Sequence, residues 1–252
     1  MSKITTNSFL KGWNQNKIIK EIDKANTNQL NFEKEDFNIK NLNIQDDSIQ
    51  NHLLKKLLDS TASCQISDAL NNLTGRNGVL KNIKSINNKK TYGRIITVKT
   101  DSDDWGTSLL GIDKAKKGEI LFILSLGESS AIWGELTSQC SKEKGLSGTV
   151  ICGATRDIDF LVDFDYPVFA SEIVPNAGKP LGLGIVNPEL ELEKVKIKPG
   201  DFLFADMSGC VLVPQELFSD VIMETLKIKL KESEIVSKIK KGKSLSEILN
   251  LR

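Results

Sequence analysis

Short apolar runs and helical spacings alternate through the middle of the chain. A helix is predicted in SSAIWGELTSQCSKEKG (129–145), where apolar residues recur at helical spacing up to a terminal Gly145. A short helix is predicted in IDFLVDF (158–164). Strands are predicted in four runs rich in β-branched and other apolar residues: GRIITVKT (93–100), GEILFILSL (118–126), GTVICG (148–153) and YPVFASEIV (166–174). This alternation predicts an α/β core.

Helical patterns also flank this core. Helices are predicted in SIQNHLLKKLLDS (48–60) and STASCQISDALNNL (60–73), with Ser67 and Asp68 capping or flanking the start of the second. Residues 215–249 are strongly helical, and their apolar stripe is expected to pack either on the body of the protein or on another subunit. A further amphipathic helix is predicted within the first 22 residues.

Composition narrows the class of protein. The 252 residues are 39% hydrophobic and 27% charged, and their interspersed charges sum to +1, so we expect one main domain and no nucleic-acid partner. No apolar run approaches the roughly 20 residues that span a bilayer, and the N-terminal segment lacks the apolar core of a signal peptide. We therefore expect a cytoplasmic protein with no membrane partner.

Cysteine and histidine usage restricts the chemistry further. The single histidine, His52, excludes histidine-rich metal sites and, unless His52 itself serves, nucleophiles paired with histidine. Acid–base chemistry is therefore expected from carboxylates, lysines or a metal-bound water. Four widely spaced cysteines are predicted to be buried, reduced thiols: Cys64, Cys140, Cys152 and Cys210.

Two segments place polar residues where a strand is predicted to lead into a helix, namely LSLGESSAIWGEL (124–136) and CGATRD (152–157). Ligands of α/β folds gather at such places, because free backbone N–H groups point outward there. In the second segment, Arg156 can form a two-pronged hydrogen bond to a carboxylate, and Asp157 can hold a hard divalent cation. Together they suit an anionic substrate held against Mg²⁺ or Mn²⁺.

The same residues also have a purely structural interpretation. Asp157 would then cap the helix that begins at Ile158, Arg156 would form a surface ion pair, and Glu135 would complement its helix dipole. Arg156 and Asp157 are not expected to pair with each other, because adjacent side chains do not face each other on a helix or strand. From these residues alone, the structural interpretation is favoured.

Acidic residues in two other segments are interpreted as structural. Asp103 and Asp104, beside Trp105, resemble a paired-carboxylate site but are more typical of a solvated loop. Asp206, in ADMSGC, is predicted to shape a tight turn.

The order of five motifs resembles that of a known family. STASCQISDAL, AIWGEL, GLSGTVICGATRD, YPVFA and KPGDFLFADMSGCVLVP resemble the RraA-like family, which includes 4-hydroxy-4-methyl-2-oxoglutarate aldolases and regulators of ribonuclease activity. The resemblance implies a swivelling β/β/α-type α/β fold that assembles as a homotrimer or a hexamer, with sites at subunit interfaces. It divides the chain into a mainly helical N-terminal extension (1–57), a single core domain (58–217) and a C-terminal helical tail (218–252).

The resemblance also implies roles for individual residues. Arg156 and Asp157 match the G-x-x-R-D motif, in which the arginine binds the pyruvyl end of the substrate and the aspartate binds Mg²⁺ or Mn²⁺. Glu135 matches the acidic residue of a G-[DE]-[LM] motif that holds metal-bound water. The backbone amides of Leu136 and Thr137 match those that cradle the substrate carboxylate.

These roles imply a metal-dependent (class II) aldolase or oxo-acid lyase that acts on a small 2-oxo acid through a pyruvate enolate, by aldol cleavage, decarboxylation or both. The tail, KESEIVSKIKKGKSLSEIL, resembles that of longer aldolase-like members, in some of which a tail glutamate reaches a neighbouring site; Glu232 and Glu234 are both candidates. A related enzyme with another hydroxy- or oxo-acid substrate remains an alternative. So does a non-catalytic protein-binding regulator of the ribonuclease-regulating type.

Overall fold

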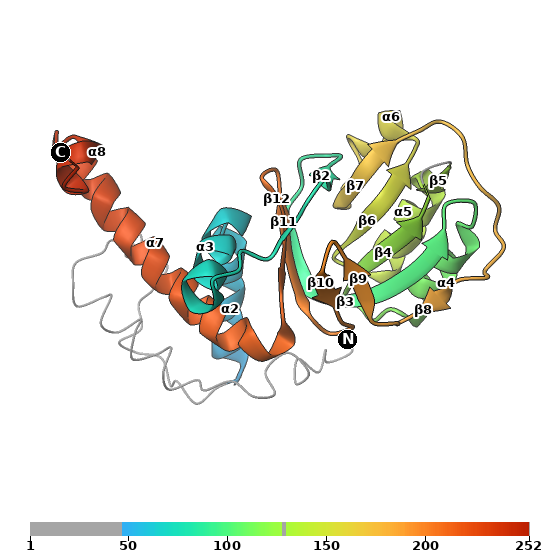
Figure 1. Ribbon diagram of the computed structural model, residues 1–252, viewed down its shortest axis with the longest axis horizontal. Helices are drawn as coiled ribbons and strands as arrows, with labels where there is room; N and C mark the ends of the chain where they lie inside the picture. Colours follow the sequence, from blue (N-terminus) through green and yellow to red (C-terminus); the bar gives the residue numbers. More distant parts are fainter. Residues whose placement is uncertain (1–46, 128–129, 252) are drawn as a thin grey trace. The chain divides into compact units, whose positions relative to one another are not determined.

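The computed structural model describes residues 47–127 and 130–251. The helix predicted within the first 22 residues lies outside this range, as does most of the N-terminal extension. The described residues form two compact units, one of residues 62–218 and one that combines residues 47–61 with residues 219–251 (Figure 1). The boundaries expected at 57 and 217 stay a prediction.

A ten-stranded mixed sheet is the centre of the unit 62–218, with strand order β1-β12-β11-β3-β4-β6-β7-β2 (Figure 1). Four neighbours run parallel: β3 (Thr91–Asp101), β4 (Ile120–Leu126), β6 (Gly148–Thr155) and β7 (Val168–Ile173). The short β5 (Ala131–Trp133) is also parallel to β6. The remaining pairings of this sheet are antiparallel and involve β1 (Val79–Leu80), β2 (Lys84–Ser85), β8 (Ile185–Val186), β11 (Phe202–Asp206) and β12 (Gly209–Val213).

The predicted strands form because their apolar residues are buried on both faces of this sheet. Along β4, Ile120 and Phe122 belong to one apolar cluster, whereas Leu121 and Ile123 belong to the other. Successive side chains of a strand point to opposite faces, so a continuous apolar run suits a strand that is covered on both sides. A separate two-stranded sheet pairs β9 (Leu190–Leu192) with β10 (Val195–Ile197). The α/β prediction is confirmed.

Helices of this unit are α3 (Ser63–Thr74), α4 (Gly106–Lys114), α5 (Glu135–Lys144) and α6 (Ile158–Leu161). A 3-10 turn follows at Gln215–Leu217. The helix predicted to end at Gly145 does end there, in a left-handed cap with φ 81°. Its predicted start was wrong, because Ala131 and Trp133 pair with Ala154 and Thr155 of β6 and so form β5 instead. Likewise, α3 begins at Ser63 rather than near Ser67.

The other unit contains α2 (Asp47–Ser60), α7 (Phe218–Lys240) and α8 (Leu245–Ile248). Lys229 Nζ on α7 donates a hydrogen bond to the carbonyl oxygen of Ser60, 2.6 Å away. The helical pattern predicted to continue to residue 249 is interrupted at Gly242, whose φ of 87° is left-handed. Across residues 47–127 and 130–251, none of the helices combines the length and the apolar character needed to cross a bilayer.

All four cysteines are free thiols, as predicted, but only part of the burial prediction is confirmed. Cys210 is buried and Cys152 is partly buried. Cys64 and Cys140 are exposed, because the buried faces of α3 and α5 are formed by other positions of those helices. The turn at Asp206 is confirmed by a hydrogen bond from the Ser208 amide to Asp206 Oδ1 at 2.8 Å.

Candidate functional site

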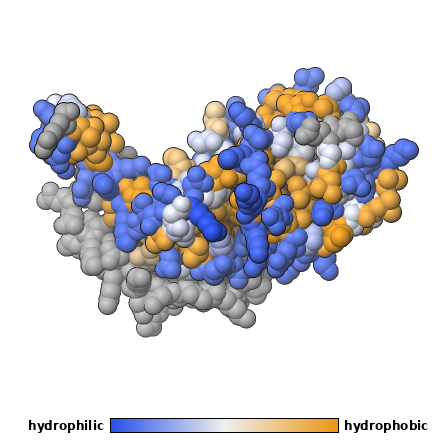
Figure 2. Space-filling view, in the orientation of Figure 1, coloured by the Kyte–Doolittle hydropathy of each residue, from blue (hydrophilic) through white to orange (hydrophobic). Residues whose placement is uncertain are grey.

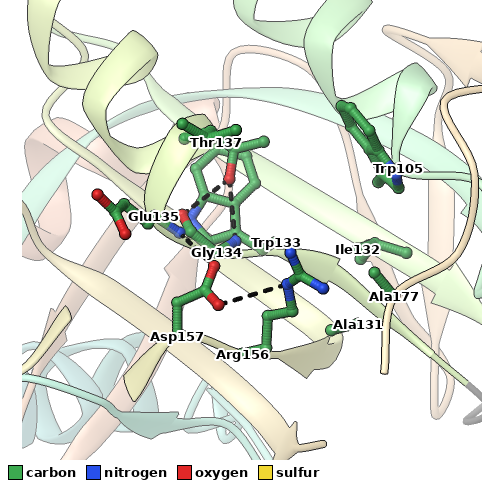
Figure 3. A pocket seen from close by; sticks show the side chains of 11 residues that line it. Trp105, Ala131, Ile132, Trp133, Gly134, Glu135, Thr137, Arg156, Asp157 and Ala177 are labelled. Carbon is green, nitrogen blue, oxygen red and sulfur yellow. Dashed lines mark hydrogen bonds and ion pairs between the residues drawn. The ribbon is translucent and has the colours of Figure 1, made fainter. Parts of the chain in front are cut away.

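The candidate site lies where two parallel strands end side by side. β5 ends at Trp133 and leads through Gly134 into α5, whereas β6 ends at Thr155 and leads through Arg156 and Asp157 into α6. Trp133 is paired with Thr155 in the sheet. Because the strands are parallel, their carboxyl ends share one edge, which places Glu135 beside Asp157 although they lie 22 positions apart (Figure 3).

A pocket at this edge brings together all five residues predicted for the site. Figure 3 shows its lining, which consists of Trp105, Ala131, Ile132, Trp133, Gly134, Glu135, Leu136, Thr137, Arg156, Asp157 and Ala177. The structure therefore places the residues of both strand–helix connections on one surface.

Asp157 has an unusual backbone that sets the direction of its side chain. Its φ of 58° and ψ of 41° lie in the left-handed region, which aspartate tolerates better than most residues do. It makes no side-chain cap hydrogen bond to α6. Instead, Asp157 Oδ2 accepts a hydrogen bond from the Glu135 amide at 3.0 Å, at the start of α5. Asp157 therefore occupies the N-cap position of α6, as interpreted from the sequence, but its side chain does not cap that helix.

Gly134 is required by this arrangement. A Cβ atom at position 134 would lie 2.3 Å from Asp157 Oδ2 and 3.2 Å from Arg156 Cγ. Since real Cβ atoms essentially never approach other atoms within 3.0 Å, any larger residue would displace the carboxylate. The φ of −177° at Gly134 is open to every residue, so close approach rather than backbone conformation selects glycine here.

Arg156 and Asp157 do contact each other, contrary to the expectation for adjacent residues. Arg156 Nε lies 3.5 Å from Asp157 Oδ1, and the two side chains are 42% and 34% exposed. The left-handed backbone at Asp157 explains the difference, since it takes the chain out of the helix and strand geometries that separate adjacent side chains. Figure 3 shows the two terminal nitrogens of the guanidinium turned away from Asp157, so they remain oriented toward the pocket.

Glu135 contributes its amide to Asp157 but turns its carboxylate elsewhere. Glu135 Oε1 accepts a hydrogen bond from Gln139 Nε2 at 2.9 Å, and in Figure 3 this carboxylate points away from Arg156. Thr137 closes the turn at Gly134, because its Oγ1 accepts from the Gly134 amide and donates to the Gly134 carbonyl, both at 3.0 Å. The amides of Leu136 and Thr137 lie in the first turn of α5, where the helix supplies no acceptor for them.

The donor set suits a hard divalent cation held with few protein ligands. In the described part of the chain, no group of three or more histidine, cysteine or acidic side chains is placed to hold a metal. The pocket instead offers the carboxylate of Asp157, whereas the Glu135 carboxylate is turned toward Gln139 and would reach an ion only through water. Magnesium commonly binds through one or two carboxylates and completes its coordination with water and substrate oxygens, so these residues fit Mg²⁺ or the similar Mn²⁺.

Comparison with known proteins shows which family the chain belongs to. Residues 63–212 match the family model described as RraA-like, Aldolase/RraA. The chain belongs to the RraA-like family. An uncharacterized protein of Methanocaldococcus jannaschii is 39% identical over 68% of this RraA-like chain and 85% of its own length. A putative 4-hydroxy-4-methyl-2-oxoglutarate aldolase of Halalkalibacterium halodurans is 29% identical over 64% of the chain and 77% of its own length.

A solved structure supports the same assignment. The RNA-processing inhibitor RraA of Thermus thermophilis is 27% identical to this RraA-like chain, with a TM-score of 0.53 over 59% of this chain and 92% of that one. The expected RraA-like α/β fold, with its C-terminal helix, is thus confirmed.

Sequence reasoning missed the part that Asp104 plays in this RraA-like chain. Its solvated-loop interpretation was wrong, because Asp104 is 3% exposed. Its carboxylate accepts hydrogen bonds from Thr107 Oγ1 at 2.6 Å and from the amides of Leu181, Gly182 and Leu183 at 3.0, 2.8 and 2.8 Å. Burial opposes ionisation of Asp104, but these hydrogen bonds outweigh it and hold its pKa below the usual range. Asp104 thereby fastens the loop around residue 182 beside Trp105, which lines the pocket.

Proposed function

We propose that this chain is a divalent-metal-dependent lyase that releases pyruvate from a small 2-oxo acid, by aldol cleavage, by decarboxylation, or by both. The observation that carries the proposal is the convergence of Arg156, Asp157 and the start of α5 on one pocket. Names of related proteins at about 30% identity support a lyase of the aldolase type.

Each of the five residues predicted for the site has a proposed task that follows from its chemistry. Arg156 would bind the substrate carboxylate through its terminal nitrogens, with the amides of Leu136 and Thr137 as further donors. Asp157 would bind Mg²⁺ or Mn²⁺ through its carboxylate, and Glu135 would hold the ion through a water molecule. When bound, such an ion supplies positive charge beside the keto oxygen, where negative charge grows as the carbon–carbon bond breaks.

In the proposed aldol cleavage, the bond between C3 and C4 breaks while the 4-hydroxyl group loses its proton and becomes a carbonyl. The electron pair of that bond passes to the pyruvate half, which takes up a proton at C3. Glu135, which is partly exposed, would move these protons through water, since the described lining of the pocket contains no histidine.

The test is pyruvate release from oxaloacetate and from 4-hydroxy-2-oxo acids, with Mg²⁺ or Mn²⁺ and with a metal-only reaction subtracted. We expect release by the wild type, at least a 10²-fold lower rate in Arg156→Ala, and loss in chelator. Arg76→Ala is the matched control, because Arg76 is exposed and lies outside the pocket. Absence of pyruvate from the whole panel with wild-type protein would overturn the proposal.

A second candidate function is regulation by protein binding, which the similarity to the RNA-processing inhibitor favours. A regulator without catalysis has no need of a carboxylate held in a left-handed backbone or of a glycine that clears space for it. Co-purification with a ribonuclease or a helicase, unaffected by Arg156→Ala, would favour this candidate over the lyase.

We further propose that the protein assembles as a homotrimer or a hexamer, with the pocket near a subunit interface. Large apolar side chains are exposed on the unit 62–218, and Figure 2 shows hydrophobic surface there among polar residues. They include Leu136 beside the pocket, which is 77% exposed, and Leu183, which is 80% exposed. Burial of such residues stabilises subunit association. Light scattering of the purified protein tests the assembly, and a monomer at micromolar concentration would contradict it.

A further inference from the structure

The pocket has a charged side and an apolar side. Glu135, Arg156 and Asp157 form the charged side. The apolar side consists of Trp105, Ala131, Ile132 and Ala177. Figure 3 shows Trp105 across the pocket from Glu135, with the Arg156 guanidinium between them. A substrate whose carboxylate binds Arg156 therefore meets the indole with another part of its structure.

The N–H groups of Trp105 and Ala131, on the apolar side, donate hydrogen bonds to backbone carbonyl oxygens of residues 176–179. Trp105 Nε1 donates a hydrogen bond to the Gly178 carbonyl at 3.2 Å, and the Trp105 amide donates to the Lys179 carbonyl at 3.0 Å. The Ala131 amide donates to the Asn176 carbonyl at 2.9 Å. Trp105 thus presents hydrocarbon rather than a free donor to a ligand.

Trp105 is also held firmly, so this surface is formed in advance. The Asp104 carboxylate accepts hydrogen bonds from three successive amides of the facing loop, including that of Gly182 at 2.8 Å. Close backbone approach excludes larger residues on both sides: a Cβ atom on Gly178 would lie 2.3 Å from the Asp103 carbonyl oxygen, and one on Gly106 would lie 2.5 Å from the Pro180 carbonyl carbon. A wall fixed in this way selects ligands by shape and polarity instead of adapting to them.

We infer that the preferred aldol substrate is a monocarboxylate: a 4-hydroxy-2-oxo acid whose C4 substituent is an uncharged apolar group that packs on Trp105. This inference rests on the proposed lyase function. Arg156 is the one cationic side chain in the described lining of the pocket, and the carboxylate next to the 2-oxo group would occupy it. A second carboxylate on C4 would lose its water against the indole, and the described lining that this chain supplies offers it no second cation, so its burial there is costly.

A preference for a monocarboxylate would set this chain apart from relatives named for a dicarboxylate, 4-hydroxy-4-methyl-2-oxoglutarate. In this chain, the selectivity would come from the side of the pocket formed by Trp105 and Ala177, not from the residues that carry the reaction.

The experiment compares two aldol substrates that differ only in the group on C4. Cleavage of 4-hydroxy-2-oxohexanoate yields pyruvate and propanal, whereas cleavage of 4-hydroxy-2-oxoglutarate yields pyruvate and glyoxylate. We expect wild-type kcat/KM to be about 10- to 100-fold higher for the hexanoate, the range that a difference in one buried group produces. Trp105→Phe should keep this order, whereas Trp105→Lys, which adds a cation, should narrow or reverse the ratio.

The wild-type comparison needs no variant, so it decides the matter even where a substitution disturbs folding. Pyruvate release from both substrates, with equal kcat/KM or with the dicarboxylate preferred, would overturn the monocarboxylate inference and leave the lyase proposal intact. Pyruvate release from neither of them, nor from oxaloacetate, would overturn both.

Discussion

Replacement of Gly134 by alanine is the sharpest perturbation of the site that the structure offers. The new Cβ atom would lie 2.3 Å from Asp157 Oδ2, whereas ordinary contacts begin at 3.4 Å, so the carboxylate must move by the difference, about 1.1 Å. That movement disturbs the 3.0 Å hydrogen bond from the Glu135 amide. Because a misplacement of about 1 Å can cost about 10²-fold in rate, we expect pyruvate release to fall about 100-fold in Gly134→Ala.

Stability measurements show whether the clash is with Asp157 itself. Urea unfolding should give Gly134→Ala a loss of about 1–3 kcal/mol, the usual cost of overpacking. Asp157→Gly removes the carboxylate and suits the φ of 58°, so in that background the same alanine should cost less than about 0.5 kcal/mol. Wild-type activity in Gly134→Ala, or equal costs in the two backgrounds, would refute the claim that Gly134 positions Asp157.

Substitutions at Asp157 and Asp104 separate charge from structure. Asp157→Asn should abolish pyruvate release with little change in melting temperature, because asparagine also tolerates the left-handed backbone. Asp157→Ala should cost about 1–2 kcal/mol more in stability than Asp157→Asn. Equal activity of Asp157→Asn and wild type would show that the charge is not needed. Asp104→Asn should lower the free energy of unfolding by about 2–4 kcal/mol at pH 7. Hydrogen bonds hold the pKa of folded Asp104 below its unfolded value of about 3.9. The stabilisation that ionised Asp104 provides is therefore complete above that pH and declines as the pH falls further. The difference in free energy of unfolding between wild type and Asp104→Asn should thus narrow below about pH 4. A difference that stays constant from pH 7 to pH 3 would contradict this.

Much of the fold could be predicted from the sequence because its signals are local. The apolar run of β4 and the glycine that ends α5 each depend on a few neighbouring residues, and both predictions were confirmed. β5, by contrast, was wrongly predicted as helix. Ala131 and Trp133 form a strand only because they pair with β6, which lies further along the chain. Long-range pairing of this kind leaves little trace in a three-residue stretch.

The sequence predicted which residues gather at the candidate pocket but not the geometry of that pocket. Placement of Arg156 and Glu135 beyond two strands followed from the general behaviour of α/β folds. The left-handed backbone of Asp157, the clearance at Gly134 and the burial of Asp104 depend on contacts between distant segments. An aspartate that accepts hydrogen bonds from the amides of a distant segment has the same letter in the sequence as an aspartate exposed to water. No local sequence pattern therefore distinguished the two kinds of aspartate.

The most direct test of the central claim is a crystal structure of the protein soaked with Mg²⁺ and pyruvate. We predict that the ion contacts the Asp157 carboxylate and that the pyruvate carboxylate contacts the terminal nitrogens of Arg156 and the amide of Leu136. Pyruvate and ion bound elsewhere, or a pocket that stays empty at saturating concentrations of both, would contradict the claim that Arg156, Asp157 and Glu135 form one site for a metal and a 2-oxo acid.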